Sequence, residues 1–235
     1  MSGRLYLVPN LLGIVPPEDV LPARTLAVAR ALRHFVVENA KPARAFLKSV
    51  GTPTPLQAIG IEEIGATPSL ARCAALLAPA RAGNDVGMLS DAGCPGIADP
   101  GALLVAAAHR EGIAVVPLVG PSSILLALMA SGMNGQGFAF HGYLPIKPDE
   151  RGAAILRLEA AAQKSGAAQL FIETPYRNPA LLAALITACR AETRLCVAAD
   201  LTTAGESIES RRIADWRGRD LASYAKRPAM FVLQA

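Results

Sequence analysis

The chain has 235 residues, enough for one large domain or two small ones with a substantial hydrophobic core. Hydrophobic residues make up 52% of it, but no run of 18 apolar residues occurs, so we expect no membrane-spanning segment. The net charge of +4 permits binding to nucleic acid without requiring it.

The amino-terminal residues run directly into an expected strand and lack a signal-peptide pattern. The four cysteines show no C-x-x-C spacing, which predicts reduced thiols in a cytoplasmic protein. His34, His109 and His141 are too few and too scattered to indicate a metal site, so we expect no bound metal.

Strand and helix patterns alternate through the first half of the chain, which predicts a parallel sheet covered by helices on both faces. The first expected helix contains Pro22, which we expect its first turn to tolerate. The expected strands are 4–8, 34–37, 57–64, 85–90 and 113–119, and the expected helices are 16–33, 42–50, 68–81 and 102–110.

The pattern changes after an apolar helix at 124–130, in which Met129 is expected to lie in the core. Strands 194–199 and 206–213 have only a short connection, which predicts an antiparallel pair. We therefore expect an α/β fold of two domains, residues 1–119 with a parallel sheet and residues 120–235 with a mixed sheet. The other expected elements are strands 138–144, 167–172 and 229–233 and helices 149–164 and 179–190.

The segment 90–101 reads S-D-A-G-C-P-G-I-A-D-P-G and connects an expected strand to an expected helix. In open α/β sheets, loops of this kind lie at the carboxyl ends of strands and bind ligands. Asp99 fits the N-cap of the following helix, and Pro100 fits its first residue. The glycines of the segment allow positive φ angles or a close approach of the backbone to a ligand.

The composition around this segment restricts the class of ligand. Neither common phosphate-binding motif occurs, and no Lys or Arg lies between residues 82 and 109 or between 111 and 146. Asp91 would repel a phosphate, whereas an amino group, a hydroxyl or a cationic centre suits its carboxylate. A turn-capping role for Asp91 is equally compatible with the sequence, and Cys94 fits a packing residue as well as a nucleophile.

Polar residues also follow three other expected strands. Ser122 and Ser123 precede the helix at 124–130, where they cap the helix or contact a ligand. The segments 38–41 and 173–177 cluster acidic, amide, phenolic or basic groups, and they are either substrate-side sites or ordinary turns.

A basic cluster lies near the carboxyl end of the chain. Its composition, four arginines around one tryptophan, is typical of RNA binding, although most such runs are solvated faces. The residues are Arg211, Arg212, Trp216, Arg217 and Arg219.

Three segments together resemble the tetrapyrrole methylase family, and the similarity covers nearly the whole chain. They are the segment 90–101, the V-P-L-V-G-P-S-S of 116–123 and the F-I-E-T-P-Y-R of 171–177. Within the family, the similarity is greatest to members that methylate ribosomal RNA. The resemblance implies two α/β domains, usually in a homodimer, with S-adenosylmethionine in the cleft between the domains. That donor carries a sulfonium, an amino group and ribose hydroxyls but no phosphate, which agrees with the cation-free loops.

The resemblance also implies roles for individual residues. The implied donor contacts are Asp91, Cys94, Ser122, Ser123 and Ile124, with further contacts at Leu12, Ile172, Ala199 and Ala229, and the expected catalytic residues are Glu38, Glu173 and Arg177.

The chain departs from the family pattern on the substrate side. Its first loop lacks the final Gly-Asn of T-P-I-G-N, A-E-D-T-R becomes V-E-N-A-K at 37–41, and Tyr176 replaces a His. The expected function is methyl transfer to a 2′-oxygen of ribosomal RNA, with the protein positioning the acceptor and neutralising its charge. A tetrapyrrole or other small metabolite is the alternative substrate. A catalytically inactive ligand- or RNA-binding relative is the alternative from another class.

Overall fold

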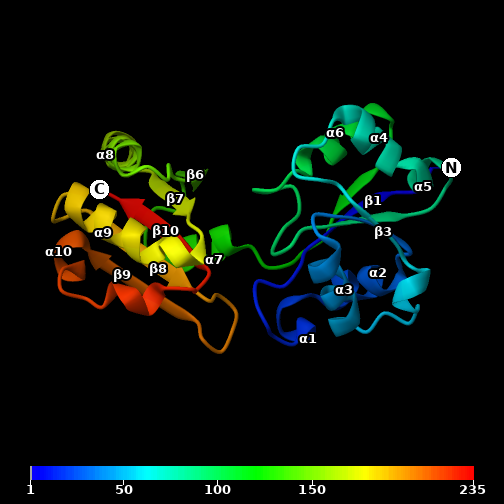
Figure 1. Cartoon of the computed structure of the whole chain (residues 1–235), viewed down its shortest axis with the longest axis horizontal. Helices are drawn as coiled ribbons and strands as arrows, with labels where there is room; N and C mark the ends of the chain where they lie inside the picture. Colours follow the sequence, from blue (N-terminus) through cyan, green and yellow to red (C-terminus); the bar gives the residue numbers. More distant parts are fainter. Residues whose placement is uncertain (1) are drawn as a thin grey trace. The chain divides into compact units, whose positions relative to one another are not determined.

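In the computed structural model, which describes residues 2–235, the chain folds into two compact units that divide between Ser122 and Ser123. Each unit is built on a five-stranded sheet (Figure 1). The predicted α/β class, with a parallel first sheet and a mixed second sheet, is confirmed. No helix within residues 2–235 is long and apolar enough to cross a membrane.

The first sheet has the strand order β3-β2-β4-β1-β5, and every neighbouring pair is parallel. The central strands are short and largely buried, as expected for a parallel sheet covered on both faces. Its strands are β1 (Leu5–Val8), β2 (His34–Val37), β3 (Gly60–Glu63), β4 (Val86–Leu89) and β5 (Val115–Pro117).

Helices cover both faces of the first sheet (Figure 1). On one face, α4 to α6 bury apolar side chains such as Leu77 and Leu104 against the strands, and on the other α1 to α3 bury Leu26 and Phe46. The helices are α1 (Pro17–Val20), α2 (Ala23–Ala31), α3 (Ala40–Ser49), α4 (Leu70–Leu76), α5 (Ala78–Arg81) and α6 (Ala102–Arg110), with the short 3-10 turn η1 at Leu56–Ala58.

Several expected elements are divided in the structure. The helix expected at 16–33 breaks at Leu21 and Pro22, and Pro22 is the residue before the first helical position of α2. The expectation that a single helix would tolerate this proline was wrong, because proline lacks the N–H that a continuing helix needs. The helix expected at 68–81 similarly divides at Leu77 into α4 and α5.

Asp99 does not cap the helix that follows the segment 90–101. That helix, α6, begins at Ala102 with Gly101 at its N-cap. The Asp99 carboxylate instead accepts hydrogen bonds from the backbone N–H of Gly96 at 2.9 Å and from that of Gly101 at 2.7 Å. The predicted N-cap was therefore wrong, and Asp99 closes the loop on itself.

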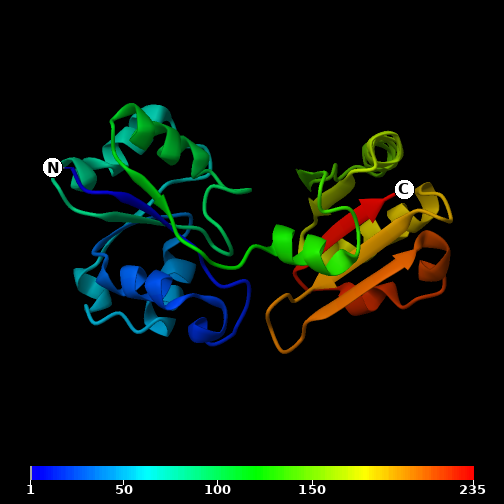
Figure 2. The ribbon, with the colours of Figure 1, turned by 180° about the vertical axis from the view of Figure 1, so that it is seen from behind.

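The second sheet has the strand order β6-β7-β10-β8-β9. Strand β6 runs parallel to β7, the other neighbours are antiparallel, and the predicted pairing of β8 with β9 is confirmed. The last strand of the chain, β10, lies in the middle of this sheet (red in Figure 2). The strands are β6 (Phe138–Tyr143), β7 (Ala168–Ile172), β8 (Arg194–Ala199), β9 (Ser207–Arg212) and β10 (Ala229–Gln234).

The two faces of the second sheet are covered unequally. On one face, the stacked rings of Phe171 and Phe231, with centroids 5.7 Å apart, pack in a core with α8, α9 and α10. On the other face, α7 packs against β8, β9 and β10. Met129 of α7 is 79% exposed, so its predicted core position was wrong. The helices are α7 (Ser123–Ser131), α8 (Pro148–Ser165), α9 (Asn178–Ala188) and α10 (Ile213–Trp216), with 3-10 turns η2 (Pro175–Arg177) and η3 (Leu221–Tyr224).

Candidate functional site

The loops that follow β1, β2, β4 and β5 all leave the first sheet at the same edge, because the strands are parallel. We call this the carboxyl edge. It gathers Asn10, Glu38, Asp91 and Pro121 from four separate stretches of the sequence. Ligands of open α/β sheets bind at such an edge, so the candidate site is built from here.

Asn10 connects the first loop to the segment 90–101. Its buried side-chain Nδ2 donates to the carbonyl oxygens of Ser90 at 2.9 Å and Asp91 at 3.0 Å. Its backbone N–H donates to the carbonyl of Gly93 at 2.9 Å, and the Ser90 hydroxyl lies 3.3 Å from the same oxygen. These bonds fix the backbone of the segment before any ligand arrives, which lowers the entropic cost of binding.

Asp91 is held through its backbone, and its carboxylate is left available. Its N–H donates to Glu38 Oε2 at 3.1 Å, and its carbonyl accepts from Asn10. Burial raises the pKa of the Asp91 carboxyl, and the nearby carboxylates of Glu38 and Glu63 raise it further. A group that donates hydrogen bonds or carries positive charge therefore stabilises this carboxylate, whereas an anion is repelled.

Cys94 and Leu12 both lie next to Gly93, two residues after Asp91. The Cys94 thiol donates to the carbonyl of Pro121 at 3.5 Å, and burial raises its pKa. The raised pKa favours the thiol over the thiolate, so Cys94 fits a packing or contact role and not a nucleophile. Gly93 has φ +68°, and a Cβ there would lie 3.2 Å from Leu12 Cδ2, so this position needs glycine.

A cavity of about 350 Å³ opens between the first loop and α3. One wall is the loop of residues 10–15, which includes Leu12, and Asp91 and Ala92 close one part of it. Helix α3 supplies the other wall through Pro42, Ala45, Phe46 and Ser49. The lining is largely apolar, with the Asp91 carboxylate as its charged group, so it suits an uncharged or cationic organic ring.

Three of the other predicted contacts lie together in the second unit. Ala199 of β8 pairs with Ala229 of β10, and the next residue of β10 pairs with Ile172 of β7. The side chains of Ala199 and Ala229 are buried in the core formed with α8 and α9. A ligand would therefore meet these two alanines through their backbone atoms.

Glu173 and Arg177 form an ion pair in which the carboxylate is buried. Glu173 Oε1 accepts from Arg177 Nη2 at 2.7 Å, from Arg177 Nε at 2.9 Å and from the N–H of Thr174 at 2.6 Å. The Glu173 side chain is fully buried, whereas that of Arg177 is 35% exposed. The hydrogen bonds that Arg177 donates to Glu173 raise the pKa of Arg177. This geometry orients the guanidinium of Arg177, so Glu173 would affect a substrate through the position of Arg177.

The remaining predicted residues divide between the two units. Glu38 is in the first unit, and Glu173 and Arg177 are in the second, so the structure brings together only the latter two of the predicted catalytic residues. Ser122 is the last residue of the first unit, and Ser123 and Ile124 begin α7 in the second. Within residues 2–235, no group of three or more His, Cys, Asp or Glu side chains is arranged to hold a metal ion.

The basic cluster near the carboxyl end does not have the structure expected of an RNA-stacking surface. Trp216 is 1% exposed, and its indole Nε1 donates to the carbonyl of Leu195. Three of the four arginines are paired with acids: Arg211 and Arg219 with Glu209, and Arg212 with Glu192 and Asp215. The indole ring is therefore part of the core, so of this cluster only the arginines face solvent where RNA could meet them.

Asn10 and the α3 wall of the cavity were not identified from the sequence as site residues. Asn10 is the second residue after β1, so the strand-end rule that selected Glu38 applies to it too. The role of Phe46 in the cavity wall has no comparable signal, because its spacing on α3 is also that of a core residue.

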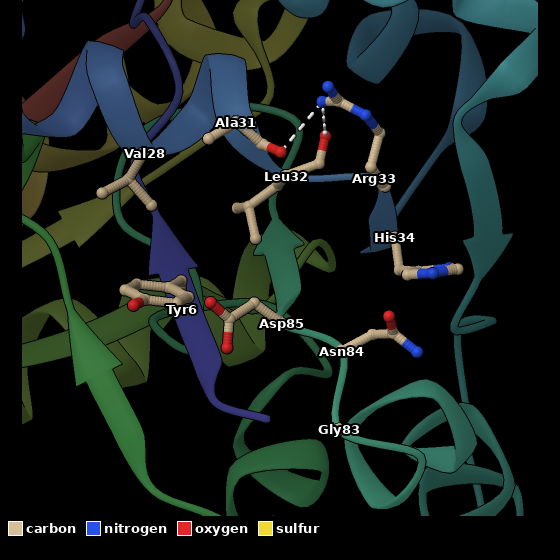
Figure 3. Close-up of a pocket in the computed structure, with 9 residues that line it drawn as sticks. All are labelled: Tyr6, Val28, Ala31, Leu32, Arg33, His34, Gly83, Asn84 and Asp85. Carbon is tan, nitrogen blue, oxygen red and sulfur yellow. Dashed lines mark hydrogen bonds between the residues drawn. The ribbon is translucent and has the colours of Figure 1, made fainter. Parts of the chain in front are cut away.

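A further cavity of about 370 Å³ lies at the opposite, amino edge of the first sheet (Figure 3). Tyr6, His34 and Asp85 surround it (Figure 3). The Arg33 guanidinium there donates to the carbonyls of Ala31 and Leu32 and so closes the end of α2. Because ligands of parallel sheets bind at the carboxyl edge, this cavity is not the candidate site.

Comparison with known proteins identifies one family. The profile described as Tetrapyrrole (Corrin/Porphyrin) Methylases matches residues 20–216. Ribosomal RNA small subunit methyltransferase I of Mesorhizobium japonicum is 34% identical over 92% of this chain and 70% of its own length. The protein of the same name from Pseudomonas aeruginosa is 32% identical over 93% of this chain and 74% of its own length.

Solved structures share the fold. Uroporphyrin-III C-methyl transferase from Thermus thermophilus, complexed with S-adenyl homocysteine, superposes with a TM-score of 0.56 at 18% identity. The match covers 99% of this chain and 97% of that chain. At this level of identity the likeness shows the fold alone.

The hydrogen bonds of Asn10 predict a specific loss of stability. In Asn10→Ala the buried carbonyl of Ser90 and the partly buried carbonyl of Asp91 lose their donor, which should cost about 1–3 kcal/mol of unfolding free energy. Urea denaturation measures this cost. Asn84→Ala is the control, since Asn84 is exposed and its change should stay within about 0.5 kcal/mol. Equal stabilities of the two variants would show that Asn10 does not hold the segment.

Proposed function

The chain belongs to the tetrapyrrole methylase family of S-adenosylmethionine-dependent methyltransferases, and from this premise we propose that it methylates a ribose 2′-oxygen of ribosomal RNA. The observation that carries the proposal is the similarity, over more than nine tenths of this chain, to two proteins named ribosomal RNA small subunit methyltransferase I. Because ribosomal RNA is methylated where ribosomes assemble, the proposal also places the protein in the cytoplasm.

The carboxyl edge fits the methyl donor S-adenosylmethionine. The donor has an amino group and hydroxyls but no phosphate, and the segment 90–101 offers the available Asp91 carboxylate without any Lys or Arg. When bound, the donor supplies an electrophilic methyl group on its sulfonium. The proposed contacts are Leu12, Asp91, Cys94, Ser122, Ser123 and Ile124, with Ile172, Ala199 and Ala229 in the second unit.

The proposed catalytic residues have different roles. Arg177, oriented by the ion pair with Glu173, would stabilise negative charge near the acceptor oxygen. A 2′-hydroxyl must lose its proton when its oxygen is methylated, and Glu38 is the carboxylate that would accept this proton. Glu38 also holds the N–H of Asp91, so it links the acceptor side to the donor segment.

A tetrapyrrole is the second candidate substrate. It is favoured by the description of the family profile and by the structural likeness to uroporphyrin-III C-methyl transferase. The largely apolar cavity beside α3 also suits part of a flat organic ring. The two candidates differ in their acceptor atom, which is a ribose oxygen in RNA and a ring carbon in uroporphyrin.

A methyl-transfer assay distinguishes these candidates. With tritiated S-adenosylmethionine, we expect label in small-subunit ribosomal RNA transcribed in vitro, in linkages that resist alkaline hydrolysis as 2′-O-methylated ones do. The parallel reaction with uroporphyrin III should remain unlabelled, and Asp91→Ala should reduce labelling of the RNA. Label confined to uroporphyrin would support the small-molecule alternative. An absence of label in both substrates would indicate an inactive relative.

Donor binding should depend on pH through Asp91. Donor affinity should be constant while Asp91 is ionised and should fall once acidification protonates its carboxylate. Because the pKa of Asp91 is raised, this fall should occur at a higher pH than it would for an ordinary aspartate. Glu38→Gln removes one of the charges that raise this pKa, so the midpoint should move to lower pH. Asp91→Asn should lose the dependence and about tenfold in affinity.

Titration calorimetry with S-adenosylhomocysteine across the acidic range measures these effects. Glu62→Gln is the control, because Glu62 is an exposed neighbour in β3 that pairs with Arg72. A midpoint that does not move in Glu38→Gln, or that rises, contradicts the proposed coupling of Glu38 to Asp91.

We extend the proposal to a homodimer through β6, the edge strand of the second sheet. Phe171 faces α8 and α9, so its neighbour Leu170 faces the opposite side of the sheet. Phe140, which pairs with Leu170, faces that side too. Phe138 and Tyr143 of β6 share that side by the same register and are 43% and 58% exposed. On this face, α7 packs mainly against β8, β9 and β10. A second copy would cover this apolar surface.

Light scattering at micromolar concentration tests the dimer. The wild type should have twice the chain mass of 24.4 kDa, and Phe138→Glu should shift the mass to that of one chain. Leu156→Glu is the matched control, since Leu156 is 53% exposed on α8, at the other face of the sheet. A wild type of 24.4 kDa, or a control that dissociates as readily as Phe138→Glu, would overturn this interface.

A further inference from the structure

Helix α3 carries a stripe of exposed positive charge. Lys41, Arg44 and Lys48 stand at i, i+3 and i+7, a spacing that places them on one side of a helix. At 1.5 Å per residue they span about 10.5 Å along the axis. Helix α3 contains no acidic residue, and in the part of the chain that the structure describes none of the three forms an ion pair. We call these three residues the α3 stripe.

The α3 stripe differs from the basic cluster near the carboxyl end in its freedom to meet an anion. There, Arg211, Arg212 and Arg219 already have carboxylate partners at 2.9 to 3.2 Å. A phosphate would have to compete with those carboxylates for the guanidinium groups. On the α3 stripe no such competition arises, so each phosphate contact gains the full release of counterions.

The α3 stripe also lies next to the cavity of the candidate site. Pro42, Ala45 and Ser49 of the same helix line that cavity, and their directions around the helix axis are adjacent to those of the α3 stripe. The opposite wall is the loop of residues 10–15, and Asp91 closes one part. A strand of nucleic acid along α3 would therefore have its phosphates on basic residues and an apolar cavity beside them.

We infer that the RNA substrate binds along α3, with backbone phosphates on Lys41, Arg44 and Lys48 and an unstacked base against the α3 wall of the cavity, opposite the proposed donor contacts Leu12 and Asp91. This inference rests on the proposed function, because it assumes that the acceptor is RNA. Single-stranded RNA suits the site, since its backbone follows a positively charged groove and its bases leave the stack to meet apolar walls. The acidic surroundings of Asp91 keep phosphates on the α3 stripe and out of the cavity.

Two variants that lose the same number of positive charges test the inference. K41Q/R44Q/K48Q removes the α3 stripe, and R211Q/R212Q/R219Q removes three paired arginines. Fluorescence anisotropy with a labelled single-stranded RNA, between about 50 and 200 mM salt, gives the slope of log affinity against log salt. Loss of three phosphate contacts should reduce this slope by about 2 in the first variant, since each contact contributes about 0.7. The second variant should keep the slope of the wild type.

Photo-cross-linking locates the base. RNA that carries 4-thiouridine should cross-link to the peptides that contain residues 10–15 or 42–49. As a separate control for folding, K41Q/R44Q/K48Q should bind S-adenosylhomocysteine with the affinity of the wild type. Cross-links only to other peptides, a wild-type slope in K41Q/R44Q/K48Q, or an equal loss in the control variant would overturn the inference. Equal affinity for a poly-glutamate peptide would also overturn it, since the stripe would then be a general anion surface.

The outcomes separate this inference from the proposed function. If the wild type methylates RNA while K41Q/R44Q/K48Q keeps its salt slope, only the placement on α3 is wrong. If the wild type neither binds nor methylates RNA, the proposed function itself fails.

Discussion

The candidate site depends on the amide group of Asn10. A loop of twelve residues with three glycines has many conformations open to it, and ordering such a loop costs conformational entropy. The Asn10 side chain and backbone together bond to the carbonyls of Ser90, Asp91 and Gly93, so two loops that are eighty residues apart in the sequence become one structure. The backbone from which the Asp91 carboxylate projects is therefore held by Asn10 on one side and by Glu38 on the other.

Charge around the first sheet is distributed so that the segment 90–101 suits the methyl donor and helix α3 suits the phosphates of RNA. The segment 90–101 has carboxylates and no cation, which disfavours phosphates and suits the amino group and hydroxyls of S-adenosylmethionine. Cations without acidic partners stand instead on the neighbouring helix α3. A methyltransferase for RNA needs both environments, because its donor has no phosphate and its acceptor has one for every nucleotide.

Local sequence patterns predicted most of the fold, because each element carries its own signal. The bounds of β2, α6 and β8 agree with the expected ones, since apolar runs and turn residues mark both of their ends. Tertiary contacts account for the errors. Trp216 lies among arginines in the sequence, a composition typical of RNA binding, but its N–H donates to the carbonyl of Leu195 in β8 inside the core. Asn10 likewise has no local signal of its bonds to a segment far along the chain.

The central claim is that the Asn10-held segment is the preformed binding surface for the methyl donor. Amide hydrogen exchange with and without S-adenosylhomocysteine tests it most directly, because it reports each edge of the first sheet separately. We predict that exchange slows at residues 90–94 and stays unchanged at residues 83–85, which line the cavity at the amino edge. Slower exchange at 83–85 without any change at 90–94 would contradict the account.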